Sequence, residues 1–251
     1  MATKKTKENK ETATGANGLV GYWPFDGAYL PWTSSTAATA IDASGGGNTG
    51  TLTNMDQATS GAIGKMGQAL YFDGSNDRID VADSSVFDLS SSGAYTWSFW
   101  LKPTTFGDLK DSFATYDSGG VNFLSISTHT TSNANYGPCT KCVTATWANT
   151  GGVNYLMTHT TDNALVTNKW THILITYDGS LSQASRFVIY ADGINVTNTG
   201  DVYSNNTIIA ISPITTQIGG EPAAHMNGSI DEFRFYNRKL TAIEIAELAK
   251  P

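Results

Sequence analysis

The sequence places its only two cysteines, Cys139 and Cys142, in a C-x-x-C arrangement within a Thr/Asn/Gly-rich region. This spacing suits a redox pair, half of a zinc site or a local disulfide. A redox pair is expected to open a helix in a βαβ unit, and this region reads as a loop. Zinc needs two more ligands, and the four histidines do not show the H-x₃₋₅-H spacing. We therefore expect a disulfide that closes a short loop, or two thiols without a chemical role.

Carboxylates for glycoside hydrolysis are sparse. A retaining enzyme needs two carboxyl groups about 5–5.5 Å apart, which residues two apart on one strand face can supply. Residues 89–220 contain no Glu, and their Asp residues 178 and 192 each precede a Gly and are expected in turns. Asp108 and Asp111 lie near Gly107 and are interpreted as loop residues. No G-x-S-x-G nucleophile motif occurs. We expect no enzymatic activity, and glycoside hydrolysis is the less favoured alternative.

Aromatic side chains on loops could instead bind a ligand, because their faces stack on sugar rings while Asn and Asp bind hydroxyl groups. Several aromatics lie in Gly/Ser/Thr/Asn-rich stretches, and the alternative for each is ordinary packing. The residues predicted to bind a ligand are Trp147, Tyr136, Trp32 and Tyr155.

Charge and hydropathy exclude two classes of partner. The chain of 251 residues has a formal net charge of −7, and charged residues make up 15% of it. Beyond the first 17 residues, no basic cluster remains that could neutralise phosphates, so nucleic-acid binding is not expected. No run of about 18 apolar residues occurs, so no membrane insertion is expected either.

The first 17 residues differ from the rest of the chain. Four of the 15 basic residues lie among the first ten positions, and no apolar segment of a signal peptide follows them. Residues 1–17 are interpreted as a flexible polar tail, or as an arm that orders against a neighbouring subunit. One domain is expected over residues 18–251.

The strands that must position these residues show a period of two. In the segment 95–101, Tyr95, Trp97, Phe99 and Leu101 fall on one face, and Thr96, Ser98 and Trp100 fall on the other. Segments 171–177, 187–196 and 230–236 have similar patterns, and the dipeptide Asp192-Gly193 predicts a hairpin turn. A capping box at Thr241 and Glu244 predicts a short C-terminal helix. Strands at this spacing without intervening helices predict an all-β, antiparallel two-sheet sandwich.

Eight short motifs, in order, resemble those of laminin G-like domains in the concanavalin A-like jelly-roll superfamily. They are GYWPFDG at 21–27, DASGGGNTGTL at 42–52, GQALYFDG at 67–74, WTH at 170–172, YDG at 177–179, YADG at 190–193, IGG at 218–220 and NGSIDEFRFYNR at 227–238. The resemblance covers nearly everything after residue 18. The segment 101–169, which is longer than usual and carries the C-x-x-C, departs from it.

The resemblance implies a calcium site at the rim of the sandwich. The matching positions are Asp26, the loop of residues 45–48 with Gly47 and Asn48, and Asp231. Oxygen ligands of this kind suit Ca²⁺. The alternative is that Asp26 is a turn residue and that Asp231 accepts backbone hydrogen bonds.

These observations predict a non-catalytic, lectin-like module that binds a glycan or a surface protein. We expect it outside the cell, on a cell surface, a filament or a virion. A homo-oligomer or particle that assembles through the N-terminal arm is consistent with the polar tail. The alternative is a structural or decoration subunit that binds no glycan.

Overall fold

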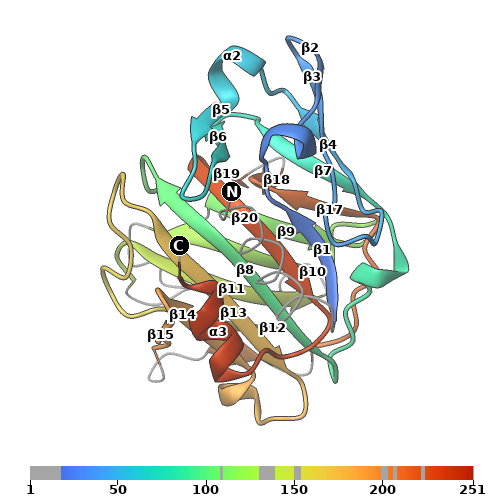
Figure 1. Cartoon of the computed structure of the whole chain (residues 1–251). Helices are drawn as coiled ribbons and strands as arrows, with labels where there is room; N and C mark the ends of the chain where they lie inside the picture. The colour runs from blue at the N-terminus through green and yellow to red at the C-terminus, as the bar shows by residue number, and fades with distance from the viewer. Residues whose placement is uncertain are drawn as a thin grey trace.

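The computed structural model describes residues 18–107, 110–129, 139–149, 154–198, 203–205, 208–221 and 224–250. Over these residues the strands form an eight-stranded and a twelve-stranded sheet, which pack as two layers (Figure 1). Strand pairing is antiparallel, except for a one-residue parallel bridge between Asp111 and His225. The predicted all-β two-sheet sandwich is confirmed.

The first layer, called sheet I here, contains the first and the last strands of the domain. Its order is β15 (Ile194–Asn195), β14 (Phe187–Ala191), β13 (Thr171–Asp178), β8 (Ala94–Pro103), β20 (Asn227–Tyr236), β6 (Gln68–Asp73) and β5 (Gly61–Ile63), and β1 (Leu19–Trp23) also pairs with β20.

The second layer, called sheet II here, is wider. Its order is β16 (Tyr203–Asn205), β12 (Asn154–His159), β11 (Cys142–Asn149), β10 (Phe123–His129), β9 (Lys110–Tyr116), β17 (Thr215–Ile218), β7 (Arg78–Ala82), β4 (Gly50–Thr53), β3 (Ala37–Ala40) and β2 (Trp32–Ser34). The pair β18 (Gly220–Glu221) and β19 (Ala224–His225) joins it beside β9.

Helical segments in the described residues are short. They are η1 (Gly27–Tyr29), α2 (Gln57–Ser60), η2 (Ser85–Phe87), η3 (Gln183–Ser185) and α3 (Ala242–Leu248). Helix α3 begins with the predicted capping box, in which Thr241 and Glu244 bind each other's backbone N–H groups. It lies over the face of sheet I, where Ile245 packs on Leu174 and Tyr236 (Figure 1). The helix can pack there because Leu174 and Tyr236 point outward from the sheet.

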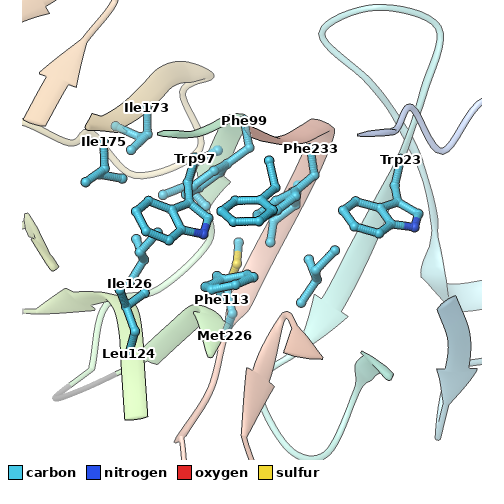
Figure 2. Close-up of a cluster of buried hydrophobic side chains, with 14 of the residues drawn as sticks. Trp23, Trp97, Phe99, Phe113, Leu124, Ile126, Ile173, Ile175, Met226 and Phe233 are labelled. Carbon is cyan, nitrogen blue, oxygen red and sulfur yellow. The ribbon is translucent and has the colours of Figure 1, made fainter. Parts of the chain in front are cut away.

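The core between the sheets is rich in aromatic rings. The predicted alternation of β8 is confirmed, since Tyr95, Trp97, Phe99 and Leu101 all belong to the core. Figure 2 shows Trp97 and Phe99 beside Phe113 from sheet II and Phe233 from β20. The ring centroids of Phe99 and Phe233 are 5.2 Å apart, and those of Trp97 and Phe113 are 6.0 Å apart. These rings fill the space between the two sheets.

Candidate functional site

The loop of residues 42–48 covers the edge of β1 that does not pair with β20. Asp42 is buried and accepts hydrogen bonds from the backbone N–H groups of Tyr22 and Asn48, both at 2.9 Å. The side-chain amide of Asn48 donates to the backbone oxygen of Val20 at 2.8 Å. The indole N–H of Trp23 donates to the backbone oxygen of Asn48 at 3.0 Å. The loop thus satisfies backbone groups that an edge strand would otherwise leave unpaired.

Two of the predicted metal-binding residues lie in this loop. Gly47 is an exposed turn residue with a φ of +77°, a conformation that glycine adopts without strain. The backbone oxygen of Asn48 already accepts the indole N–H of Trp23. The structure therefore gives Asn48 a role in holding the first strand, which the sequence motif alone did not reveal.

The other two predicted metal-binding residues, Asp26 and Asp231, both bind the turn between β5 and β6. The Oδ1 atom of Asp26 accepts the backbone N–H of Gln68 at 2.6 Å. The Oδ2 atom of Asp231 accepts the backbone N–H of Met66 at 2.9 Å. The turn lies close to these carboxylates, since a Cβ atom on Gly64 would stand 2.7 Å from Asp231 Oδ2.

Asp231 has the electrostatics expected of a cation ligand. Its side chain is fully buried, and its Oδ1 atom makes no hydrogen bond within the described residues. Burial raises the pKa of Asp231 to about 7, and the charges of Glu232 and Asp26 act in the same direction. A buried carboxylate with an unused oxygen is costly unless a cation or a proton balances it.

The donor set is compatible with a hard cation at Asp26 and Asp231. Within the described residues, no group of three or more His, Cys, Asp and Glu side chains is arranged to hold a metal ion. The remaining ligands would therefore be backbone carbonyl groups or water, which Ca²⁺ accepts readily.

The four predicted ligand-binding aromatics lie in different environments. Trp147 is fully buried in the core, where its indole N–H donates to the backbone oxygen of Ile209 and its ring lies 4.8 Å from that of Tyr177. Trp147 therefore cannot stack on a ligand from this position, contrary to the prediction. Trp32 is half-buried in β2 and packs against the core. Tyr136 lies outside the described residues.

Tyr155 lies in an aromatic row on the outer face of sheet II. Pairing of the strands places Tyr116 of β9 beside Phe123 of β10, and Ala148 of β11 between Phe123 and Tyr155 of β12. The rings of Tyr116, Phe123 and Tyr155 are all partly exposed. They point away from the core because the residues that alternate with them, such as Leu124 and Leu156, point into it. We call Tyr116, Phe123 and Tyr155 the aromatic row.

A row of polar side chains runs beside the aromatic row, two residues further along each strand. It consists of Asp80 of β7, Gln217 of β17, Ser125 of β10 and Thr146 of β11, with Ala114 of β9 in the middle. We call Asp80, Gln217, Ser125 and Thr146 the polar row. Within the described part of the chain, Gln217 Oε1 and Thr146 Oγ1 are buried and have no hydrogen-bond partner. Buried polar groups without a partner cost stability.

The carboxylates considered for hydrolysis do not form a pair in the described residues. Asp111 is buried on the outer face of sheet II, where its Oδ1 atom accepts the hydroxyl of Ser127. Asp108 lies outside the described residues. A structural hydrogen bond therefore accounts for one oxygen of Asp111.

The structure pairs Cys139 and Cys142 in a disulfide, with their Cα atoms 5.9 Å apart. Both cysteines are buried. The intervening turn is held by Asp162, whose Oδ1 atom accepts the backbone N–H of Thr140 at 2.8 Å. The disulfide thus closes the short turn before β11, and the hydrogen bond from Thr140 to Asp162 holds this turn against the loop that follows β12.

The outer face of sheet I has a different character from that of sheet II. The ammonium of Lys65 lies 4.6 Å from the ring centre of Trp100, and that of Lys102 lies 5.9 Å from the ring centre of Trp170. Arg234 forms an ion pair with Glu232 at 2.5 Å beneath the ring of Tyr22. Cations are therefore concentrated over sheet I.

Two antiparallel sheets that enclose an aromatic core, with the first and last strands paired in one sheet, define a jelly-roll sandwich. A laminin G-like family model, described as the concanavalin A-like lectin/glucanases superfamily, matches residues 73–246. The chain belongs to this superfamily, and the resemblance seen in the sequence is confirmed.

Solved structures with this fold are similar to the chain at low sequence identity. Domain 4 of the extracellular arabinanase AbnA from Geobacillus stearothermophilus, in complex with arabinotriose, has a TM-score of 0.62 and 19% identity, over 93% of this chain and 98% of that chain. The binding domain of Paraclostridial Mosquitocidal Protein 1 has a TM-score of 0.60 and 19% identity, over 92% and 52%. The ligand-binding domain of botulinum neurotoxin serotype D, in complex with N-acetylneuraminic acid, has a TM-score of 0.58 and 12% identity, over 96% and 52%.

The chain spans about half the length of the two toxin domains. At these identities the similarity establishes the fold alone. A search of curated protein sequences finds no match. Over the described ranges, no helix has the length and apolar character needed to cross a membrane.

Proposed function

We propose that this chain is a non-catalytic, lectin-like module that binds glycans on the outer face of sheet II. The observation that carries the proposal is the aromatic row, in which three partly exposed rings from three different strands share one sheet face. Aromatic faces stack on the apolar faces of sugar rings, and Asp80, the partly exposed member of the adjacent polar row, can accept a sugar hydroxyl.

The solved structures support a binding role outside the cell. Three of them are described as binding domains or as complexes with a sugar, and one belongs to an extracellular enzyme. We propose the same setting for this chain, on a cell surface, a filament or a virion. The N-terminal arm would contribute to assembly there. Light scattering after size exclusion, with and without residues 1–17, tests assembly, and a monomer in both cases contradicts it.

We also propose that calcium binds at Asp26 and Asp231 and stabilises the rim. Support comes from the unused Oδ1 atom of the buried Asp231 and from the segment of residues 66–68, whose backbone N–H groups both carboxylates accept. This cation would be structural, because it ties the last long strand to the β5–β6 turn.

A glycan array with matched variants tests the binding function. The wild-type protein should bind, whereas Phe123→Ala and Tyr155→Ala should lose binding without a change in melting temperature beyond a few degrees. Tyr29→Ala is the matched control, because Tyr29 is an aromatic that is 43% exposed and lies in η1, outside the aromatic row. Loss of binding in Tyr29→Ala alone would show that the glycan binds at the rim and not at the aromatic row. An array without any binding would contradict the lectin-like function and favour a role as a structural subunit.

A further inference from the structure

We propose that the ligand of this face is an uncharged, extended polysaccharide chain that lies along the aromatic row, across the strands. The inference rests on the proposed function and names the class of glycan. It excludes glycans that are recognised through a carboxylate, such as sialosides and polyuronates.

The direction of the ligand follows from strand pairing. Tyr116 and Phe123 lie on neighbouring strands, about 5 Å apart in the sheet. Phe123 and Tyr155 are separated by β11, so their strands are about 10 Å apart. Ala148 stands between these two rings in the pairing register and presents only a methyl group there. A linear chain that crosses the strands can therefore contact successive rings, whereas a single sugar can contact one ring at a time.

The arginine on this face is paired with a carboxylate. Among the outward-facing side chains of β4, β7, β9, β10, β11, β12 and β17, the one permanent cation is Arg78. Its Nε atom lies 2.9 Å and 3.1 Å from the two carboxylate oxygens of Asp80. Asp80 also accepts the hydroxyl of Thr53 and the amide N–H of Gln217, each at 2.6 Å. The guanidinium of Arg78 is thus paired with Asp80, and Thr53 and Gln217 hold the carboxylate of Asp80 in place.

An anionic sugar would be disfavoured here for two reasons. Its carboxylate would have to compete with Asp80 for Arg78, and it would approach a chain with a formal net charge of −7. The cations Lys65 and Lys102 lie over sheet I, on the opposite face of the sandwich. Hydroxyl groups of a neutral sugar have no such conflict, because the partly exposed carboxylate of Asp80 can accept hydrogen bonds from them.

The test compares polymers of defined charge. The neutral probes are arabinan, xylan and β-glucan with their oligosaccharides, and the acidic probes are polygalacturonate and polysialic acid. We expect binding to a neutral polymer, tighter for longer oligosaccharides, and unchanged between about 50 mM and 500 mM salt because no ion pair forms. Phe123→Ala and Tyr155→Ala should each weaken it about tenfold or more. Phe123→Leu, which keeps the bulk of the side chain, separates loss of stacking from loss of folding.

The outcomes separate this inference from the proposed function. Binding to acidic polymers alone, abolished by salt or by Lys102→Ala, would overturn the inference and leave a glycan-binding module. Equal affinity for a monosaccharide and its polymer would contradict the inference that the ligand is an extended chain. No binding to any probe would contradict the proposed function itself.

Discussion

Asp231 accepts a hydrogen bond from the backbone N–H of Met66 at 2.9 Å and so joins β20 to the turn between β5 and β6. Asp26 binds beside the same turn, because its carboxylate accepts the backbone N–H of Gln68 at the start of β6. Burial raises the pKa of Asp231 to about 7, and its Oδ1 atom has no partner among the described residues. A cation beside Oδ1 would balance the buried charge and would stabilise this turn.

Calcium is therefore expected to raise the melting temperature of the wild-type protein, and Asp231→Asn is expected to abolish the effect. At a calcium concentration of about 100 times Kd, the free energy of unfolding rises by about 2.7 kcal/mol. For a domain of this size, that corresponds to roughly 5–10 °C. Calorimetry in calcium and in chelator measures the shift. Asp56→Asn is the control, because Asp56 is a carboxylate that caps α2. Equal melting temperatures in calcium and in chelator would contradict the site.

The loop that covers β1 should be sensitive to Asp42→Ala. This change removes the acceptor of the N–H groups of Tyr22, Ser44 and Asn48. Buried donors left without a partner cost about 1 kcal/mol or more each, so the free energy of unfolding should fall by about 3 kcal/mol. Denaturant unfolding measures it. Asp56→Ala, which removes the acceptor of one N–H at the exposed start of α2, should cost about 1 kcal/mol. Equal losses in the two variants would contradict the role assigned to Asp42.

Acid should destabilise the protein through His172. Its Nε2 atom lies 2.9 Å from the hydroxyl of Ser98, and burial, aided by the charge of Arg234, lowers its pKa to about 3. The unfolded chain binds a proton near pH 6.5, whereas the folded chain does not until about pH 3. Stability is therefore full above pH 6.5 and falls as the pH drops from 6.5 towards 3.

The loss in this pH range should be smaller in His172→Gln, which has no titrating ring. The free energy of unfolding of both proteins, measured by denaturant titration at pH 7 and pH 4.5, gives the difference. The wild-type protein should lose more than the variant, by up to about 3 kcal/mol. A parallel loss in the two proteins would show that other groups cause the acid sensitivity.

Sequence patterns predicted those features that local chemistry determines. The alternation of Tyr95, Trp97 and Phe99 depends on one strand, and the capping box of Thr241 and Glu244 depends on one turn of helix, so both are visible in a short window. The hairpin turn at residues 192–193 is also determined locally, because it needs the φ of +79° that Gly193 adopts without strain. Each of these elements forms where its own residues predict it.

Of the three rings in the candidate glycan site, Tyr155 alone is predicted from the sequence as a ligand-binding residue. All eight residues of β11 are buried, so the alternation of polar and apolar exposure that usually marks a strand is absent there. Trp147 lies in a Gly/Ser/Thr/Asn-rich stretch and is therefore predicted to bind a ligand from a loop, although it points into the core from β11. The aromatic row depends on the pairing register of β9, β10, β11 and β12, which no local pattern specifies.

The disulfide offers a further test of the segment that departs from the family pattern. Cys139 and Cys142 have a sequence separation of three, and a loop this short constrains the unfolded chain by about 2 kcal/mol. The double variant Cys139→Ser/Cys142→Ser should therefore melt roughly 4–8 °C below the wild-type protein. Both cysteines are buried, so reductant can reach the bond only when the protein unfolds. Wild-type protein that has been unfolded in reductant and refolded should therefore show the same lower melting temperature. The melting temperature of the double variant should not respond to reductant. An unchanged melting temperature in the double variant would show that the disulfide does not stabilise this segment.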